Sequence, residues 1–450
     1  MAEFFKKRPS GMPAFYTIWV GQFFSLLGTG MTRFALTLWA WDLTGSATAL
    51  AFVAFFSFTP SIIFSPIAGA LVDRWDRKLV MMLSDLAAGV GTIALLILSL
   101  NGVLELWHIY VIAFVSGIFE SFQFPAYSAA ISTMVTKDQF ARTSAMLGLA
   151  GSASNIIAPI AAASVYGLFN LDGILIIDIV TFTIAYITLL IVKIPAVKHS
   201  AEGAKSRESF FQEMLYGFRF IWQRKSLFWL QTAFFMANFM FGMTIVLLNP
   251  LILSRTGNNE AILGIVSAFM GAGGVIGGIG MSALGGFKER RVRGVLWGFA
   301  ISGLLGTVVL GIGQNLAMWI FGAFCTTLFL SPINASNQAI WQTKVPPDVQ
   351  GKVFAARRVI AAIGTPLAMI IAGVLADNIF EPSMQVDGIL APIFGGLVGT
   401  GAGAGMGLMF VIVGISNAVI GVACYAVPII RDVEALVPDF DDSLIATSQD

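Results

Sequence analysis

The sequence predicts an all-α integral membrane protein with twelve transmembrane helices in two six-helix bundles, related by a parallel pseudo-two-fold repeat. The first observation is composition, because 57% of the residues are hydrophobic and only 11% are charged. Soluble domains are about one quarter charged. The second observation is that charged and turn residues divide the chain into apolar segments long enough to cross a bilayer. The third is that motifs of the first half recur in the second.

The predicted spans follow from the positions of these interruptions. In chain order they are 14–41, 47–72, 79–101, 106–133, 140–169, 172–194, 226–254, 260–286, 292–312, 315–343, 352–377 and 401–430. The apolar N-terminal stretch is too long for the core of a signal peptide and is read as a retained first helix. The segment Gly388–Gly405 precedes the last helix, and we expect it to be partly re-entrant or to lie on the outer surface.

Basic residues give the predicted orientation. All but two of the 26 Lys and Arg residues fall in one set of alternate loops, or at their edges, and that set includes Arg357 and Arg358. Such loops are cytoplasmic in membrane proteins. The sequence therefore predicts a multi-pass protein of the cell (cytoplasmic) membrane with both termini in the cytoplasm.

The two halves repeat with the same orientation. "FPAYSAAIST" (124–133) matches "SPINASNQAI" (331–340), and "VTKDQFAR" (135–142) matches "VPPDVQGK" (345–352). The offset is six helices, an even number, as in transporters built from parallel repeats. The predicted parts are an N-terminal bundle (1–194), a cytoplasmic linker with an amphipathic helix (195–225), a C-terminal bundle (226–431) and an acidic cytoplasmic tail (432–450).

Catalytic and cofactor motifs are not apparent. The chain has two cysteines and two histidines, and no phosphate-binding loop, HExxH motif or nucleophile elbow. We expect no enzyme, metal or cofactor. The net charge of +1 gives no reason to expect nucleic acid as a partner.

Ionisable residues inside predicted spans are the candidates for coupling, because a charge at membrane depth is costly and usually functional. Arg33 and Glu120 lie within helices 1 and 4, and helix rise separates them by about 9 Å in depth. We expect Glu120 to bind the proton with Arg33 as its partner; a static pair joining the two helices, or no contact, are the alternatives. Asp178 in helix 6 is a weaker candidate, with a structural role as the alternative.

Aromatic and amide side chains recur at helical spacing on the faces of four predicted spans. These faces suit a bulky amphiphile, whereas a phosphate would need a fixed Arg or Lys, which the cavity-lining faces of helices 7 and 10 do not offer. The predicted cavity residues are Thr29, Gln123, Tyr127, Gln231, Phe235, Asn238, Asn334, Asn337, Gln338 and Trp341.

The turn "GALVDRWDRK" after helix 2 is the most specific motif. Together with "PPDVQGKVF", "FYTIWVGQFFSLLGTG" and twelve spans, it makes the chain resemble the major facilitator superfamily, within it the macrolide-efflux and siderophore-exporter branch of drug:proton antiporters. The resemblance implies that the turn is a cytoplasmic latch; a positive-inside anchor is the alternative. The latch residues are Gly69, Asp73, Arg74, Arg77, Lys78 and Asp85.

Two departures from the family pattern limit what can be transferred. Asp76 stands where the family has glycine, and Ser116 stands where many drug exporters have arginine. For Asp85 we expect an arginine of the turn as partner.

The predicted function is proton-coupled export of lipophilic or amphiphilic small molecules by alternating access. The expected partners are the lipid bilayer, an amphiphilic substrate and protons, and we expect a monomer. The alternatives are a lysophospholipid transporter or flippase, in which Arg33 binds the head group, and a membrane sensor that transports nothing.

Overall fold

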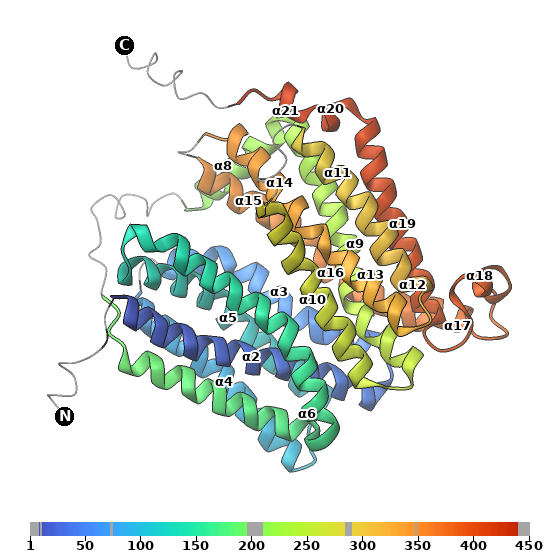
Figure 1. The fold of residues 1–450 in the computed structure, drawn as a ribbon, viewed down its shortest axis with the longest axis horizontal. Helices are drawn as coiled ribbons and strands as arrows, with labels where there is room; N and C mark the ends of the chain where they lie inside the picture. Colours follow the sequence, from blue (N-terminus) through green and yellow to red (C-terminus); the bar gives the residue numbers. More distant parts are fainter. Residues whose placement is uncertain are drawn as a thin grey trace. The chain divides into compact units, whose positions relative to one another are not determined.

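The computed structural model describes residues 9, 11–72, 75–195, 210–283, 290–346 and 349–439 of the chain. Every regular element in these residues is helical (Figure 1). The prediction of an all-α, twelve-helix membrane fold is confirmed.

The first half contains five long helices joined by short connections. Their bounds are α2 (Gly11–Thr44), α3 (Ala47–Val72), α4 (Arg77–Leu100), α5 (Leu106–Met134) and α6 (Phe140–Ile191), with the single turn η1 (Lys137–Gln139) before α6. The 52 residues of α6 cover two predicted spans and are interrupted at Asn170, which has φ 54° and ψ −158°. This backbone conformation lies far from the helical region and is one that few residues other than glycine adopt, so the helix is interrupted there, between the two predicted spans.

Several spans of the second half are divided into shorter helices. They are α8 (Phe210–Gln223), α9 (Lys225–Thr256), α10 (Glu260–Ala283), α11 (Arg291–Ile301), η3 (Ser302–Val308), α12 (Val309–Ile312), α13 (Leu316–Leu328), α14 (Leu330–Lys344), α15 (Gln350–Ala362), α16 (Gly364–Leu375), η4 (Ala376–Phe380), α17 (Glu381–Ser383), α18 (Ala391–Val398), α19 (Ala404–Ala426), α20 (Pro428–Arg431) and α21 (Val433–Leu436). The elements η3 and η4 are π-helical turns.

Length and apolarity identify ten candidate membrane spans among the described residues. The stretch Arg142–Ile191 counts once among them although it folds back at Asn170, and α2 is not among them. The boundaries of most predicted spans agree with the helices to within a few residues.

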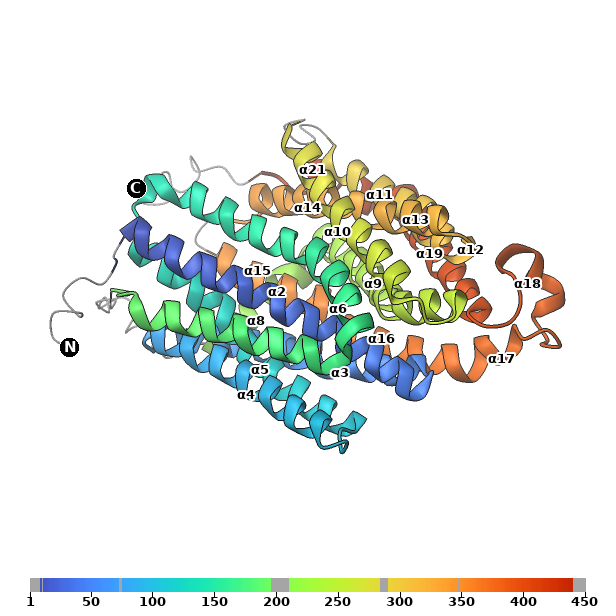
Figure 2. The same cartoon turned by 60° about the horizontal axis from the view of Figure 1, so that its bottom comes forward.

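The segment before α19 forms a compact excursion rather than part of a span. In both views α18 lies beyond the end of α19 (Figures 1 and 2). Met384 and Val398 are buried there against Leu408 of α19. Ile389 and Ile393 on the same excursion are 85% and 71% exposed.

The chain divides into two compact units. Unit 1 comprises residues 1–199, 246–268 and 372–378, and unit 2 comprises 200–245, 269–371 and 379–450. The C-terminal end of α9, the start of α10 and the junction of α16 with η4 therefore belong to unit 1, although they come from the second half of the sequence. The two compact units therefore do not coincide with the two halves of the sequence.

In unit 1, α2 packs closely along α6 (Figure 2). A Cβ on Gly21 would lie 2.3 Å from the Thr188 hydroxyl, and one on Gly28 would lie 2.1 Å from that of Thr181. Small residues at such contacts allow membrane helices to approach closely. The two helices form the wall that holds the buried acids described below.

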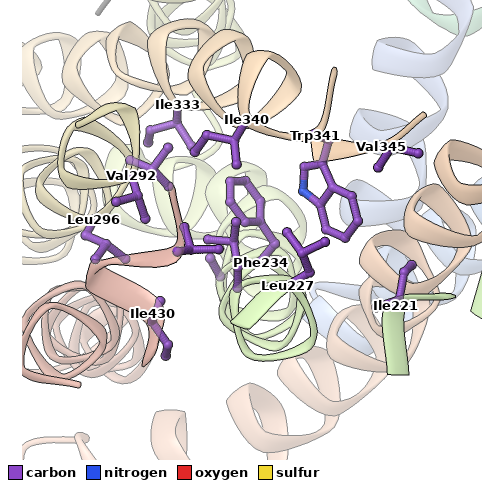
Figure 3. Close-up of a cluster of buried hydrophobic side chains, with 14 of the residues drawn as sticks. Ile221, Leu227, Phe234, Val292, Leu296, Ile333, Ile340, Trp341, Val345 and Ile430 are labelled. Atoms are coloured by element: carbon purple, nitrogen blue, oxygen red, sulfur yellow. The ribbon is translucent and has the colours of Figure 1, made fainter. Parts of the chain in front are cut away.

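Unit 2 has its main apolar core around Trp341, which is fully buried (Figure 3). Phe234, Leu227, Val292 and Ile340 belong to the same cluster. Elsewhere in this unit η3 and α19 approach so closely that a Cβ on Gly303 would lie 2.4 Å from the carbonyl oxygen of Gly414. The Trp341 core also includes residues of α8, α9 and α15, the helices that line the cavity described below.

Candidate functional site

Arg33 and Glu120 form an ion pair in unit 1. Arg33 is on α2, Glu120 is on α5, and Arg33 Nη2 donates to Glu120 Oε2. The two side chains are 51% and 49% exposed. The long guanidinium side chain therefore spans the depth difference calculated from helix rise. The pair joins two helices and leaves half of each charged side chain uncovered.

Asp178 is buried one helix away from this pair. Its Oδ2 accepts hydrogen bonds of 2.9 Å from Thr32 of α2 and from Thr92 of α4. Gly28 leaves space for the carboxyl group, since a Cβ there would lie 2.9 Å from Asp178 Oδ1. The acid thus joins α2, α4 and α6, and Thr32 directly precedes Arg33. Thr29, one turn earlier on α2, is half-buried.

Asp85 is the centre of a second buried polar cluster. Its two carboxyl oxygens accept hydrogen bonds from Gln22 at 2.8 Å and from Gln123 at 2.7 Å. Among the described residues the partners of Asp85 are thus two amides rather than the expected arginine: Arg77 donates to the Ala129 carbonyl instead, and Arg74 lies outside the described residues. The Tyr127 hydroxyl and the Oε1 atom of Gln123 are buried without a hydrogen-bond partner. Sequence reasoning missed Gln22, although it shares a helical face of α2 with Ser25 and Thr29.

The charged turn is described only in part. Asp73 and Arg74 lie outside the described residues, and of Gly69 the structure describes only its place in α3. The Asp76 carboxylate accepts from the Leu79 amide at 2.9 Å and caps the N-terminus of α4. An aspartate at this position is stabilising because it satisfies an unpaired helical donor. The departure from the family's glycine therefore has a local structural role.

Two basic residues of the turn bind main-chain carbonyls within unit 1. Arg77 Nη1 donates to the Ala129 carbonyl of α5 at 2.5 Å. Lys78 Nζ donates to the Val192 carbonyl, just after α6, at 2.6 Å. The negative end of the helix dipole also stabilises a cation at this position. The turn thus ties the ends of α4, α5 and α6 together.

The amide side chains predicted for the second half lie in unit 2 in different environments. Gln231 is 2% exposed and donates to the Arg357 carbonyl at 3.0 Å. Trp341 donates to Asn337 at 3.0 Å inside the apolar core. Asn238 donates to a carbonyl of its own helix, and Asn334 is exposed. These placements bring Gln231 toward α15 and place Asn337 and Trp341 deep in the helix packing.

A cavity of about 320 Å³ lies between α8, α9 and α15. Its lining residues are Phe218, Thr232, Phe235, Val359, Ile360 and Ile363. Of the predicted cavity residues, Phe235 lines it directly and Gln231 is one helical turn away from Phe235. The cavity is almost wholly apolar, as a lipophilic ligand requires.

Arg357 is a polar residue of unit 2 that the sequence analysis does not include among the candidate site residues. It was assigned to a cytoplasmic loop, but it is the eighth residue of α15, about 10 Å along the helix. Its Nη2 donates to Gln338 at 2.6 Å. A cation from the eleventh span thus contacts Gln338 of α14, although the predicted cavity faces of helices 7 and 10 themselves offer none. No pattern within the basic sequence "AARRV" distinguishes Arg357 from Arg358.

Asp377 forms an unexpected cluster in unit 1. Its carboxylate accepts from the Ser46 hydroxyl at 2.6 Å and from the Ala47 and Thr48 amides at 3.0 and 2.8 Å. The carboxylate of η4 thus caps the N-terminus of α3. A residue from the eleventh span therefore holds the start of the second.

Helical spans that enclose an ion pair and two buried acids are typical of a membrane transporter rather than an enzyme. The family model "Major Facilitator Superfamily" matches residues 18–369, and the chain belongs to this superfamily.

Two curated relatives support the predicted branch. Macrolide efflux protein A of Streptococcus pyogenes is 29% identical over 368 residues, covering 81% of this chain and 90% of the relative. Enterobactin exporter EntS of Shigella flexneri is 24% identical over 346 residues, covering 76% and 80%. The predicted resemblance to macrolide-efflux proteins and siderophore exporters is confirmed.

Two solved structures show the same fold. A bacterial homologue of the human lysosomal transporter Spinster has a TM-score of 0.65 and 13% identity, over 91% of this chain and 96% of that one. A bacterial homologue of the iron transporter ferroportin has a TM-score of 0.64 and 14% identity, over 92% and 99%.

Proposed function

We propose that the protein exports lipophilic or amphiphilic small molecules across the cell membrane in exchange for protons, by alternating access. The similarity to a macrolide efflux protein and to a siderophore exporter supports outward transport. The basic loops support a topology with both termini in the cytoplasm. We further propose that the protein works as a monomer with a small amphiphile as its substrate.

The Arg33–Glu120 pair is the observation that supports this proposal most directly. Both side chains are about half exposed and lie well inside the helices α2 and α5. An ionised pair facing lipid tails would be costly, so the uncovered half faces water. A carboxylate that water reaches at this depth can exchange a proton with solution.

Protonation of Glu120 removes the charge that attracts Arg33. The guanidinium is then free to move. The neighbouring residue on α2, Thr32, donates a 2.9 Å hydrogen bond to Asp178 of α6. A change in the ion pair therefore reaches the contact between α2 and α6. This link gives Asp178 a positioning role in the proposed coupling, and Glu120 the proton-binding role.

Contacts within unit 1 supply the closed side of an alternating-access cycle. Asp377 caps α3, and Asn258 accepts a 2.8 Å hydrogen bond from the Trp41 indole. Both acceptors come from the second half of the sequence, whereas Trp41 and α3 come from the first. By the proposed topology these contacts lie on the outer side, and they must break when that side opens.

The charged turn after α3 is proposed as the latch of the opposite, cytoplasmic side. Arg77 and Lys78 hold the ends of α5 and α6, and Asp76 holds the start of α4. The turn would therefore move as one piece with these helices. Asp73 and Arg74, the other predicted members of the latch, lie outside the described residues.

The test of coupling is transport in inverted membrane vesicles energised with a proton gradient. Vesicles with the wild-type protein should accumulate a radiolabelled macrolide, and Glu120→Gln should abolish accumulation while binding remains. Asp387→Asn is the matched control, because Asp387 is an exposed acid outside the helices. Gradient-driven accumulation by Glu120→Gln at the wild-type rate would refute the assignment.

The same vesicles separate the alternative cargo. Labelled lysophospholipid should cross proteoliposomes no faster than empty liposomes under the proposed function. Faster crossing that is lost in Arg33→Gln and retained in Glu120→Gln would favour a lipid transporter with Arg33 as its head-group site.

A further inference from the structure

Arg357 holds a positive charge inside the helix packing of unit 2. Its guanidinium carbon lies 5.6 Å from the centre of the Trp341 ring and 5.3 Å from that of Phe354. One nitrogen, Nη2, is bound by Gln338, whereas Nη1 is shielded from solvent and has no hydrogen-bond partner. A desolvated guanidinium donor without an acceptor is unfavourable. The site is therefore incomplete as it stands.

Within the part of the chain that the structure describes, no carboxylate forms an ion pair with Arg357. The other buried cation of unit 2, Lys344, does have one, because its Nζ lies 2.6 Å from Asp439 Oδ1. A buried charge is usually paired. Arg357 thus differs from Lys344 in lacking the anion that would compensate its burial.

The cavity of unit 2 lies one helical turn from Arg357. Ile360, three residues further along α15, lines it together with Phe235 of α9. Gln231 lies one turn before Phe235, donates to the Arg357 carbonyl and has a buried Oε1 atom without a partner. Two unsatisfied polar atoms, a donor on α15 and an acceptor on α9, therefore belong to the two helices that supply most of the lining of an apolar cavity of about 320 Å³, although neither residue lines it.

We propose that Arg357 is the anion-recognition residue of this cavity. The ligand is an amphiphile whose carboxylate, or a similar single anionic oxygen group, accepts from Nη1 while its apolar body occupies the cavity. The flexible side chain turns toward the cavity to make this contact, and Gln231 Oε1 accepts from a hydroxyl of the ligand. The inference rests on the proposed function in one respect: it assumes that this ligand is the transported substrate.

This assignment narrows the proposed substrate class from amphiphiles in general to amphiphilic anions. A guanidinium–carboxylate contact in a desolvated site is charge-assisted and about twice as strong as a neutral hydrogen bond. An apolar cavity alone would bind the neutral form of a scaffold more tightly than the anionic form, because burial of an unpaired carboxylate carries a desolvation cost. The charge preference is therefore what identifies Arg357 as part of the site.

The experiment measures equilibrium binding to the full-length protein in lipid nanodiscs, with no gradient. Three probes share one ring system: 2-naphthoate, 2-naphthylmethanol and 2-naphthylmethylammonium. We expect 2-naphthoate to bind at least about tenfold more tightly than the alcohol, and the ammonium to bind weakest. Arg357→Gln should reduce the affinity for 2-naphthoate to that for the alcohol or below it, and leave the affinity for the alcohol unchanged.

Arg358→Gln is the matched control, since Arg358 has the same charge one position further on and is exposed. It should bind 2-naphthoate as the wild type does, and Arg357→Lys should give an intermediate affinity. Equal loss of all three probes in Arg357→Gln, or the same loss in Arg358→Gln, would overturn the proposal. If Arg357→Gln does not fold, the wild-type protein and Arg357→Lys provide the test. The proposal is also overturned if the wild type binds the three probes with equal affinity, or if Arg357→Lys binds 2-naphthoate as tightly as the wild type does. Because no gradient is used, the result is independent of whether Glu120→Gln transports.

Discussion

Replacing Asp377 with alanine removes the carboxylate that caps the N-terminus of α3. The carboxylate receives three hydrogen bonds, from the Ser46 hydroxyl and from the Ala47 and Thr48 amides. Loss of a helix N-cap costs about 0.5–2 kcal/mol, and the negative charge near the positive helix end adds about 0.3–1 kcal/mol. Asp377 is half-buried, so water replaces part of what is lost. We therefore expect a cost of about 1–2 kcal/mol.

That free energy corresponds to about a 5- to 30-fold increase in local opening. Hydrogen exchange measured by mass spectrometry on the protein in nanodiscs reports it directly in the peptide that contains Ala47 and Thr48. Ser46→Ala leaves the Ala47 and Thr48 amides on the carboxylate, so its exchange should increase less at these two residues and more at Ala49, whose amide donates to the Ser46 hydroxyl at 3.2 Å. Asp387→Ala is the control, since Asp387 is exposed. Unchanged exchange of the α3 N-terminus in Asp377→Ala would refute the capping argument.

Two further predictions concern the packing of unit 2. A methyl group on Gly414 would lie 2.6 Å from the Gly303 carbonyl oxygen, so Gly414→Ala should destabilise the protein by about 1–3 kcal/mol. The measurement is the melting temperature in detergent, and the control is Gly396→Ala, because a methyl group at Gly396 would meet open space. Equal melting temperatures for the two variants would contradict the prediction. Truncation after residue 431 removes α21, whose Val433 is fully buried, and leaves Lys344 without its carboxylate, so it should cost about 2 kcal/mol or more. Truncation after residue 439 keeps both contacts, and equal melting temperatures for the two truncations would show that the tail does not stabilise the unit.

Much of the architecture could be predicted from local sequence. The scarcity of charge and the position of Lys and Arg gave the spans and the expected topology, because the cost of a charge in lipid applies to each segment separately. Asn170 and the segment before α19 could be placed as interruptions for the same reason. The π-turns η3 and η4 could not be predicted, since they depend on packing against neighbouring helices.

The residues of the polar sites could be predicted from the sequence only where they stand out within a single helix. Arg33 and Glu120 were identified as unusual because each stands alone in an apolar span. Their pairing could be proposed from helix rise, whereas the amide partners of Asp85 could not. Hydrogen-bond partners come from helices that are distant in sequence, and rotation of a helix about its axis decides which side chains meet.

The sequence by itself determined that this protein lies in a membrane, that its halves repeat and that Arg33 and Glu120 are exceptional, because transfer of charge into lipid is costly wherever the residue lies. Only the tertiary structure decided that Asp377 caps α3 and that Arg357 is enclosed beside an apolar cavity with an unpaired donor. The physical reason is that burial and hydrogen-bond satisfaction are properties of neighbouring groups, and those neighbours are set by packing rather than by order along the chain.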